Sequence, residues 1–209
     1  MDRKGILLVV SGFSGAGKGT LMKELVGRYD NYALSISATT RSPREGELDG
    51  REYFFRTKEE FEQMIADDAL IEHACYVGNY YGTPRAYVEE QLALGRDVIL
   101  EIEIQGALQI KKRFPDTLLL FVSTPDAETL KNRLIGRGTE SLDVVEKRLS
   151  RASEEAEGIE NYDYFIINDD LDTCVTQVHQ IIQGEHSRVS RNLELINTIK
   201  KDISKFQKG

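Results

Sequence analysis

A glycine-rich segment near the N-terminus has the residue types and spacing to bind phosphate groups. An apolar run at residues 6–10 precedes it and a helical pattern follows it, which is the strand–turn–helix order of a P-loop. Glycines let the backbone curl until its N–H groups face phosphate oxygens, and the start of the helix adds partial positive charge. Lys18 can reach the β- and γ-phosphates of a nucleoside triphosphate. We therefore expect a triphosphate site made of Gly12, Phe13, Ser14, Gly15, Ala16, Gly17, Lys18, Gly19 and Thr20.

The position directly after the lysine departs from the usual P-loop pattern. A Ser or Thr hydroxyl normally follows the lysine, but here Gly19 follows it and Thr20 comes next. Thr20 could contact a phosphate while Mg²⁺ keeps mostly water and nucleotide oxygens, so no protein ligand is assigned to the metal. The Gly-Lys-Gly-Thr ending is similar to that of adenylate kinases, and the loop alone does not identify the phosphoryl acceptor.

A second charged loop surrounds Pro43. This proline keeps the segment extended or turned, so Arg41 and Arg44 do not belong to a helical ion-pair surface. Two guanidinium groups in one short loop suit a dianionic phosphate, which accepts bidentate hydrogen bonds. A solvated loop in which Arg44 pairs with Glu45 or Glu47 explains the same residues equally well.

The composition restricts the class of protein. The 209 residues, 40% of them hydrophobic, suffice for one α/β body but leave little room for a second full domain. A formal net charge of −8 argues against a nucleic-acid binder, yet a small polyanion needs only a few well-placed arginines. No stretch is long and apolar enough to span a bilayer, and the first apolar run lacks a cleavage pattern. Two isolated cysteines, Cys75 and Cys174, are typical of reduced thiols, so we expect a cytoplasmic protein. From the charge and the short apolar runs, we expect binding to neither nucleic acid nor membrane.

Strand-like runs and helical stretches alternate along most of the chain. The apolar runs at residues 98–100, 118–122 and 165–167 are short and partly β-branched, and amphipathic helical patterns separate them. This alternation predicts an α/β fold of the P-loop NTPase type, with a mainly parallel sheet and helices on both of its faces.

Two regions interrupt this alternation. Residues 35–84 contain several short strand-like pieces and one helix, and we interpret them as an inserted, mixed α+β lobe. A long polar helix after two glycines predicts a hinged helical lid at about residues 136–158. The P-loop core would then comprise residues 1–34 and 85–209.

The C-terminal segment has one apolar helical stripe, made of Val189, Leu193, Ile196, Ile199 and Ile203. The simplest prediction is that this stripe packs against the body of the protein. A contact between subunits is the alternative, and the oligomeric state is not predicted.

The order of motifs closely resembles that of the guanylate kinase family. Besides the P-loop, the matching segments are Ser37–Glu47, Gly50–Tyr53, Leu70–Glu72, Gly78–Thr83, Glu101–Gly106, Gly136–Gly138, Lys147–Leu149 and Asn168–Asp170. They cover nearly the whole chain. The resemblance implies transfer of a phosphoryl group from ATP to GMP, and also to dGMP, with Mg²⁺ as cofactor. The inserted lobe would bind GMP.

The same resemblance implies roles for individual residues. The GMP phosphate would be held by Ser37, Arg41, Arg44, Tyr53 and Tyr81. Glu72 and Thr83 would contact the guanine, and Glu47, Glu101 and Glu103 would line the acceptor site. Many family members have aspartate in place of Glu101 and Glu103, so the charge here lies one methylene further out. The tyrosines could instead be half-buried strand aromatics.

Glu72 also has a chemical argument of its own. The pairing edge of guanine offers two neighbouring donors, N1–H and the exocyclic amine, and one carboxylate accepts both. Adenine presents an acceptor at N1, so a buried carboxylate there would reject it. Thr83 could donate to O6, although Thr83 followed by proline also fits a helix N-cap. The alternative for Glu72 is a surface acid beside His73.

Charge spacing on the predicted lid separates candidate arginines. Lys147 has Asp143 four positions before it, an ordinary helix-surface pair, whereas no acidic residue lies three or four positions from Arg148. Arg137 lies between two glycines. The family resemblance also points to these two arginines, with Arg133 as a third, as contacts to the triphosphate.

The resemblance places Asn168 at the adenine end of ATP, although a turn residue would look the same. The expected catalytic residues are Lys18, Arg41, Arg137 and Arg148. Two other readings remain open: a kinase for another nucleoside monophosphate, and a non-catalytic phosphopeptide-binding module.

Overall fold

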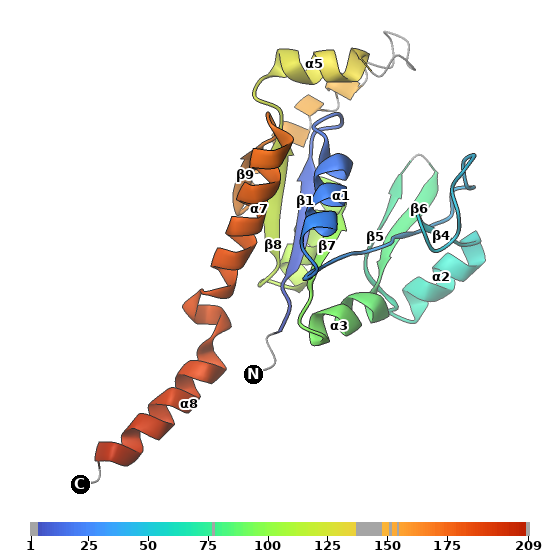
Figure 1. Ribbon diagram of the computed structural model, residues 1–209. Coiled ribbons are helices and arrows are strands. Elements are labelled where there is room, and N and C mark those ends of the chain that lie inside the picture. The colour runs from blue at the N-terminus through green and yellow to red at the C-terminus, as the bar shows by residue number, and fades with distance from the viewer. Residues whose placement is uncertain (1–3, 77, 137–147, 151, 154, 208–209) are drawn as a thin grey trace.

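The structure is a computed structural model and describes residues 4–76, 78–136, 148–150, 152–153 and 155–207 (Figure 1). Its centre is a five-stranded, fully parallel sheet in the order β2-β7-β1-β8-β9. The strands are β1 (Leu7–Gly12), β2 (Tyr32–Leu34), β7 (Asp97–Glu101), β8 (Leu118–Ser123) and β9 (Tyr164–Ile167). This sheet confirms the predicted α/β fold class.

Helices cover both faces of the central sheet, which explains why its strands are apolar runs and not alternating ones. Leu8 and Val10 of β1 pack against α1 (Lys18–Arg28) and α7 (Leu171–His186). Val9, between them, faces the opposite layer. That layer is formed by α3 (Arg85–Ala93) and α4 (Ile104–Arg113).

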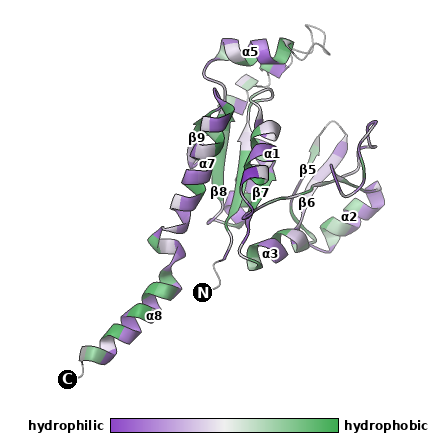
Figure 2. Cartoon of the chain, viewed as in Figure 1, coloured by the Kyte–Doolittle hydropathy of each residue, from purple (hydrophilic) through white to green (hydrophobic). Residues whose placement is uncertain are grey.

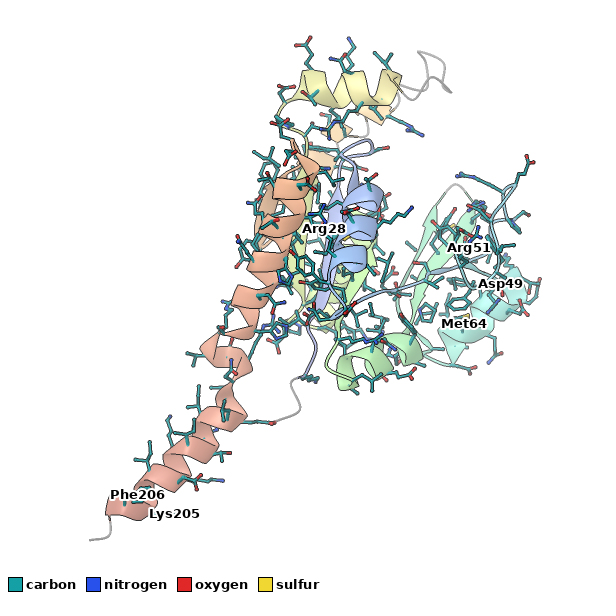
Figure 3. The ribbon with its side chains drawn as sticks, viewed as in Figure 1. Arg28, Asp49, Arg51, Met64, Lys205 and Phe206 are labelled. Carbon is teal, nitrogen blue, oxygen red and sulfur yellow. The ribbon has the colours of Figure 1, made fainter. Side chains whose placement is uncertain are left out.

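A second sheet lies within residues 38–84, part of the segment that the sequence predicts to be an inserted lobe. Its strand order is β4-β3-β6-β5, with β6 antiparallel to both neighbours and β3 parallel to β4. The elements are β3 (Ala38–Thr39), β4 (Phe54–Phe55), α2 (Lys58–Ala66), β5 (Leu70–Tyr76) and β6 (Asn79–Pro84). Figure 3 shows Asp49 and Arg51 on the outer loop of this lobe and Met64 on α2. The helix α2 begins with a complete capping box between Thr57 and Glu60, as its sequence dictates.

The predicted lid lies largely outside the described residues, since 137–147 are not among them. Within the described part, residues 148–150, 152–153 and 155–156 are helical. Ala152 is buried against Leu130 and Leu134 of α5 (Ala127–Ile135). The part of the segment around Ala152 therefore packs against α5, close to Phe13 of the P-loop.

The C-terminal helix α8 (Leu193–Ser204) does not pack as predicted. None of its residues is buried, and Ile199 and Ile203 are 47% and 54% exposed. Figure 1 shows α8 leading away from the body after the 3₁₀ turn η2 (Val189–Arg191), and Figure 2 shows its apolar residues along one stripe. The side chain of Asn192 donates to the carbonyls of His186 and Arg188, both at 2.8 Å, which directs the chain outward. Figure 3 places Lys205 and Phe206 at the far end.

Within the described residues, no helix combines the length and apolar character needed to cross a membrane.

Candidate active site

The P-loop closes around a pocket of about 440 Å³ at the carboxyl end of β1, lined by Ser14, Gly15, Gly17, Lys18, Gly19, Thr20 and Glu101. Two glycines are required by their surroundings. Gly12 has φ 152°, and a Cβ there would lie 2.1 Å from the carbonyl oxygen of Val122 on β8. Gly17 has φ 88°, and a Cβ there would lie 2.6 Å from Nδ2 of Asn168. No side chain of the described residues caps α1, so the N-terminus of the helix faces the pocket with its own N–H groups.

Lys18 lies across the mouth of this loop. Its Nζ donates to the carbonyls of Gly12 at 2.7 Å and Phe13 at 3.2 Å. The ammonium group thus remains inside the ring of P-loop atoms, beside the N-terminus of α1. This is the position from which it can bind terminal phosphate oxygens.

Asn168 and Arg133 hold the back of the P-loop. The buried amide of Asn168 donates through Nδ2 to the carbonyl of Ala16 at 2.8 Å, and Nη1 of Arg133 reaches the same oxygen at 3.5 Å. The backbone N–H of Asn168 donates to Ser123 at the end of β8. Asn168 therefore links the edge of the sheet to the loop. Its contact with adenine stays a prediction, whereas its contact with the P-loop is a feature of the fold.

Asn168→Asp is expected to raise the KM for ATP about tenfold while changing the KM for GMP less than twofold. Aspartate is nearly the same size, but its carboxylate would face the Ala16 carbonyl without a donor between them, so the P-loop must shift. Steady-state kinetics with each substrate varied in turn measures the two constants. Asp169→Asn, at the exposed neighbouring residue, is the control. An equal rise in both constants would contradict this role.

Glu101 and Glu103 lie where β7 ends and α4 begins. Glu101 is exposed at the pocket, but neighbouring protein atoms displace part of its water and so raise its pKa; nearby Lys18 lowers it and the charge of Glu103 raises it. A Cβ at position 19 would lie 3.9 Å from Oε2 of Glu101. Gly19 and the longer acidic side chain are thus neighbours, so the two departures from the common pattern occupy one place in the structure.

The donors beside the P-loop fit a lightly held Mg²⁺. Glu101 and Thr20 offer oxygen atoms at the same pocket, the donor type that Mg²⁺ prefers. Among the described residues, no three His, Cys, Asp or Glu side chains come together as a metal cage. Water and nucleotide oxygens would supply the remaining ligands of an ion held by Glu101 and Thr20.

In the lobe, Glu47 organises the arginine loop. Its carboxylate accepts two hydrogen bonds from Nη2 of Arg41, at 2.9 and 3.0 Å, and one from the backbone N–H of Arg44 at 2.7 Å. That backbone N–H, with Arg41, holds the pKa of Glu47 below its usual range. Of the two arginines, Arg41 is therefore the one paired with Glu47. The exposed Arg44 side chain forms no ion pair with any described residue.

Aromatic rings complete the phosphate side of the lobe. The guanidinium carbon of Arg41 lies 5.3 Å from the ring centre of Tyr53, and the rings of Tyr53 and Tyr81 meet at 6.1 Å. Burial raises the pKa of Tyr53, with the neighbouring Tyr81 as the next cause. Ser37 directly precedes β3 and accepts a backbone hydrogen bond from Phe54. The structure thus brings Arg41, Tyr53 and Tyr81 together, as a phosphate site requires.

Glu72 and Thr83 form a buried pair between β5 and β6. The Thr83 hydroxyl donates to Oε1 of Glu72 at 2.7 Å, and Thr83 is 1% and Glu72 8% exposed. Burial raises the pKa of Glu72, while the bond from Thr83 opposes this shift. The pair excludes the surface-acid reading of Glu72. It also excludes the capping role of Thr83, because Pro84 is the N-cap residue of α3 and no described side chain caps that helix.

The lid arginines are only partly described. Arg137 lies outside the described residues. Arg148 lies in the described helical residues 148–150, and its side chain is half-buried. Its contact with a triphosphate stays a prediction.

The sequence does not predict the contact between Asn168 and Ala16. The two residues are 152 positions apart, and no local pattern joins them. The only signal was an asparagine at the end of an apolar run, which also fits a turn.

Comparisons with known proteins agree with this geometry. The family model described as guanylate kinase matches residues 4–185. A guanylate kinase of Bacillus anthracis is 52% identical over 191 residues, which are 91% of this chain and 93% of that protein. A guanylate kinase of Listeria innocua serovar 6a is 47% identical over 208 residues, covering 99% of this chain and 100% of that protein. The crystal structure of guanylate kinase from Anaplasma phagocytophilum superposes with a TM-score of 0.73 at 30% identity, covering 90% of this chain and 89% of that one. The chain belongs to the guanylate kinase family.

Proposed function

We propose that this protein transfers the γ-phosphoryl group of ATP to GMP, forming ADP and GDP. The observation that carries the proposal is the buried pair of Glu72 and Thr83 in the lobe beside a P-loop core. A carboxylate in this setting accepts from the two adjacent donors of guanine and rejects the bare acceptor of adenine. Family membership supports the same reaction, and the resemblance extends the proposal to dGMP.

The chain's own groups act by alignment and by charge. Lys18 and the P-loop N–H groups hold the triphosphate, while Arg41, oriented by Glu47, holds the acceptor phosphate. Arg137 and Arg148 are proposed to reach the transferred group from the lid. The GMP phosphate is already ionised at neutral pH, so the reaction needs no general base. We also propose that the enzyme works in the cytoplasm, where both substrates occur.

Mg²⁺ belongs to this proposal as a cofactor that would supply neutralising charge at the triphosphate when bound. Glu101 and Thr20 are the residues placed to hold it or its water ligands.

The direct test is an ATP-dependent phosphorylation assay of the purified protein with GMP, dGMP, AMP, CMP and UMP as acceptors. We expect turnover with GMP and dGMP and turnover lower by several orders of magnitude with AMP. Equal rates with AMP and GMP would reject the guanine assignment. No phosphorylation of any acceptor would favour a binding module over an enzyme.

Arg148→Ala is expected to lower kcat by about 100-fold, and Lys147→Ala by less than threefold. An arginine that meets the transferring phosphoryl group stabilises the charge of the transition state. Lys147 lies four positions after Asp143, a spacing that predicts an ordinary helix-surface pair with no such role. The comparison uses kcat at saturating ATP and GMP, with circular dichroism to check folding. Equal losses of kcat in the two variants would contradict the choice of Arg148 over Lys147 as the residue that contacts the phosphoryl group.

A further inference from the structure

We propose that Gly106 determines specificity for guanine, because its missing side chain leaves the space in which the Glu72 carboxylate lies. Gly106 acts through Glu72 and is therefore a positioning residue. This inference rests on the proposed function and deepens it.

The two residues come from different parts of the fold. Glu72 lies on β5 in the lobe, and Gly106 lies in the first turn of α4 in the core. A Cβ on Gly106 would lie 3.2 Å from Oε2 of Glu72 and 3.7 Å from its carboxyl carbon. The 3.2 Å separation is tighter than most Cβ contacts in proteins, so one of the two groups must yield. The core helix therefore forms one wall of the guanine subsite.

The carboxylate has little room to withdraw from that wall. On its other oxygen, Oε1, it accepts the 2.7 Å hydrogen bond from Thr83. The same Cβ would also lie 3.2 Å from Cδ1 of Ile102, so an added methyl group is crowded by a second side chain besides Glu72. Since Glu72 is only 8% exposed, its carboxylate lies between the Thr83 hydroxyl and the surface of Gly106. A methyl group at position 106 must displace this carboxylate by a few tenths of an ångström.

Such a displacement should weaken the recognition of one group of guanine in particular, the 2-amino group beside N1–H. Guanine binds the carboxylate through N1–H and the 2-amino group together, and two parallel hydrogen bonds demand a well-defined carboxylate plane. Hypoxanthine has the N1–H but lacks the 2-amino group, so it depends on one of these bonds only. A tilted carboxylate therefore lowers the preference for GMP over IMP. A general loss of folding or of P-loop function leaves this ratio unchanged.

The test is Gly106→Ala with Gly184→Ala as the matched control. Both glycines lie in helices, and a Cβ at Gly184 on α7 would meet nothing within 4 Å. Alanine is a better helix former than glycine, so neither variant is expected to lose helix stability from the backbone. We expect Gly106→Ala to lower kcat/KM for GMP about tenfold and to reduce the GMP:IMP ratio of kcat/KM by a similar factor. The KM for ATP should change less than twofold, and Gly184→Ala should match the wild type.

Glu72→Asp supplies a second, independent measurement. Its shorter side chain withdraws the carboxylate from position 106, so adding Gly106→Ala to Glu72→Asp should lower kcat/KM for GMP less than twofold. Additive losses in the double variant, or a wild-type GMP:IMP ratio in Gly106→Ala, would overturn the proposal. The ratio does not depend on the amount of folded enzyme, so it decides the question even if Gly106→Ala melts at a lower temperature. Absence of GMP phosphorylation by the wild type would instead reject the proposed function.

Discussion

Lys18→Ala is expected to lower kcat/KM for phosphoryl transfer by about 1,000-fold while the protein stays folded. Removal of one preorganised charge or donor at a developing anion typically costs about 10²- to 10³-fold in rate. Lys18 carries such a charge, and its position is fixed because its Nζ donates a 2.7 Å hydrogen bond to the carbonyl oxygen of Gly12 in the P-loop. The N–H groups at the start of α1 remain in the variant, so binding of ATP should weaken less than turnover does.

The measurement is steady-state GMP phosphorylation together with thermal unfolding. Lys23→Ala is the matched control, since Lys23 is an exposed lysine on the same helix α1. We expect the control to match the wild type in both rate and melting temperature. A Lys18→Ala variant with more than a tenth of wild-type kcat/KM would contradict the phosphate-binding role of the loop.

Glu72→Gln is expected to lower kcat/KM for GMP about 100-fold and to shift the GMP:AMP ratio by more than that. Glutamine replaces one acceptor with an NH₂ group, so one guanine donor meets another donor, and the bond that remains is no longer charge-assisted. The same NH₂ group can donate to N1 of adenine, which raises turnover of AMP. The KM for ATP, which the P-loop binds, should change less than twofold.

Glu62→Gln on α2 is the control for this substitution, because Glu62 is exposed and pairs with Lys58 on its own helix. An unchanged GMP:AMP ratio in Glu72→Gln would reject the assignment of Glu72 to the base.

The same residue predicts a pH dependence with a definite sign. Burial raises the pKa of Glu72, and guanine requires the ionised carboxylate. The KM for GMP should therefore rise as the pH falls through this raised pKa. The rise should begin at a higher pH than it would if an exposed glutamate bound the base. A raised pKa in the folded state also means that the ionised group opposes folding at neutral pH and ceases to do so in acid. Glu72→Gln should therefore abolish the acid rise in KM, and it should melt above the wild type at about pH 7 but not at about pH 4.

Features made of neighbouring residues were readable from the sequence. The P-loop is one contiguous run between a buried strand and a helix, so its geometry follows from local backbone freedom and from the order of the elements. The alternation of apolar runs and helical patterns predicted the parallel sheet and its two helical layers for the same reason. The resemblance to the guanylate kinase family predicted that Glu72 contacts guanine, and the two neighbouring donors on the pairing edge of guanine gave a chemical reason for that prediction.

Where the sequence allowed two partners for a side chain, or two positions for a helix, only the tertiary structure distinguished them. Arg44 could have paired with Glu45 or Glu47, but the fold of the loop brings the Arg41 side chain to Glu47 instead. Thr83 could have capped α3, but the pairing of β5 with β6 brings Glu72 within reach of its hydroxyl. The stripe on α8 looked like a core surface, yet the turn before it directs the helix away from the body.

The sequence by itself determined the P-loop segment and, through the order of its motifs, the resemblance that predicts the groups for phosphate and for guanine, because those motifs are short segments with distinctive residue types. The tertiary structure alone decided how the groups are held. Asn168 braces the P-loop at Ala16 from 152 residues away, and Gly106 of the core borders Glu72 of the lobe. Such contacts depend on where the sheet and its helices bring distant segments together, and hydrophobic periodicity specifies the elements without specifying that distance.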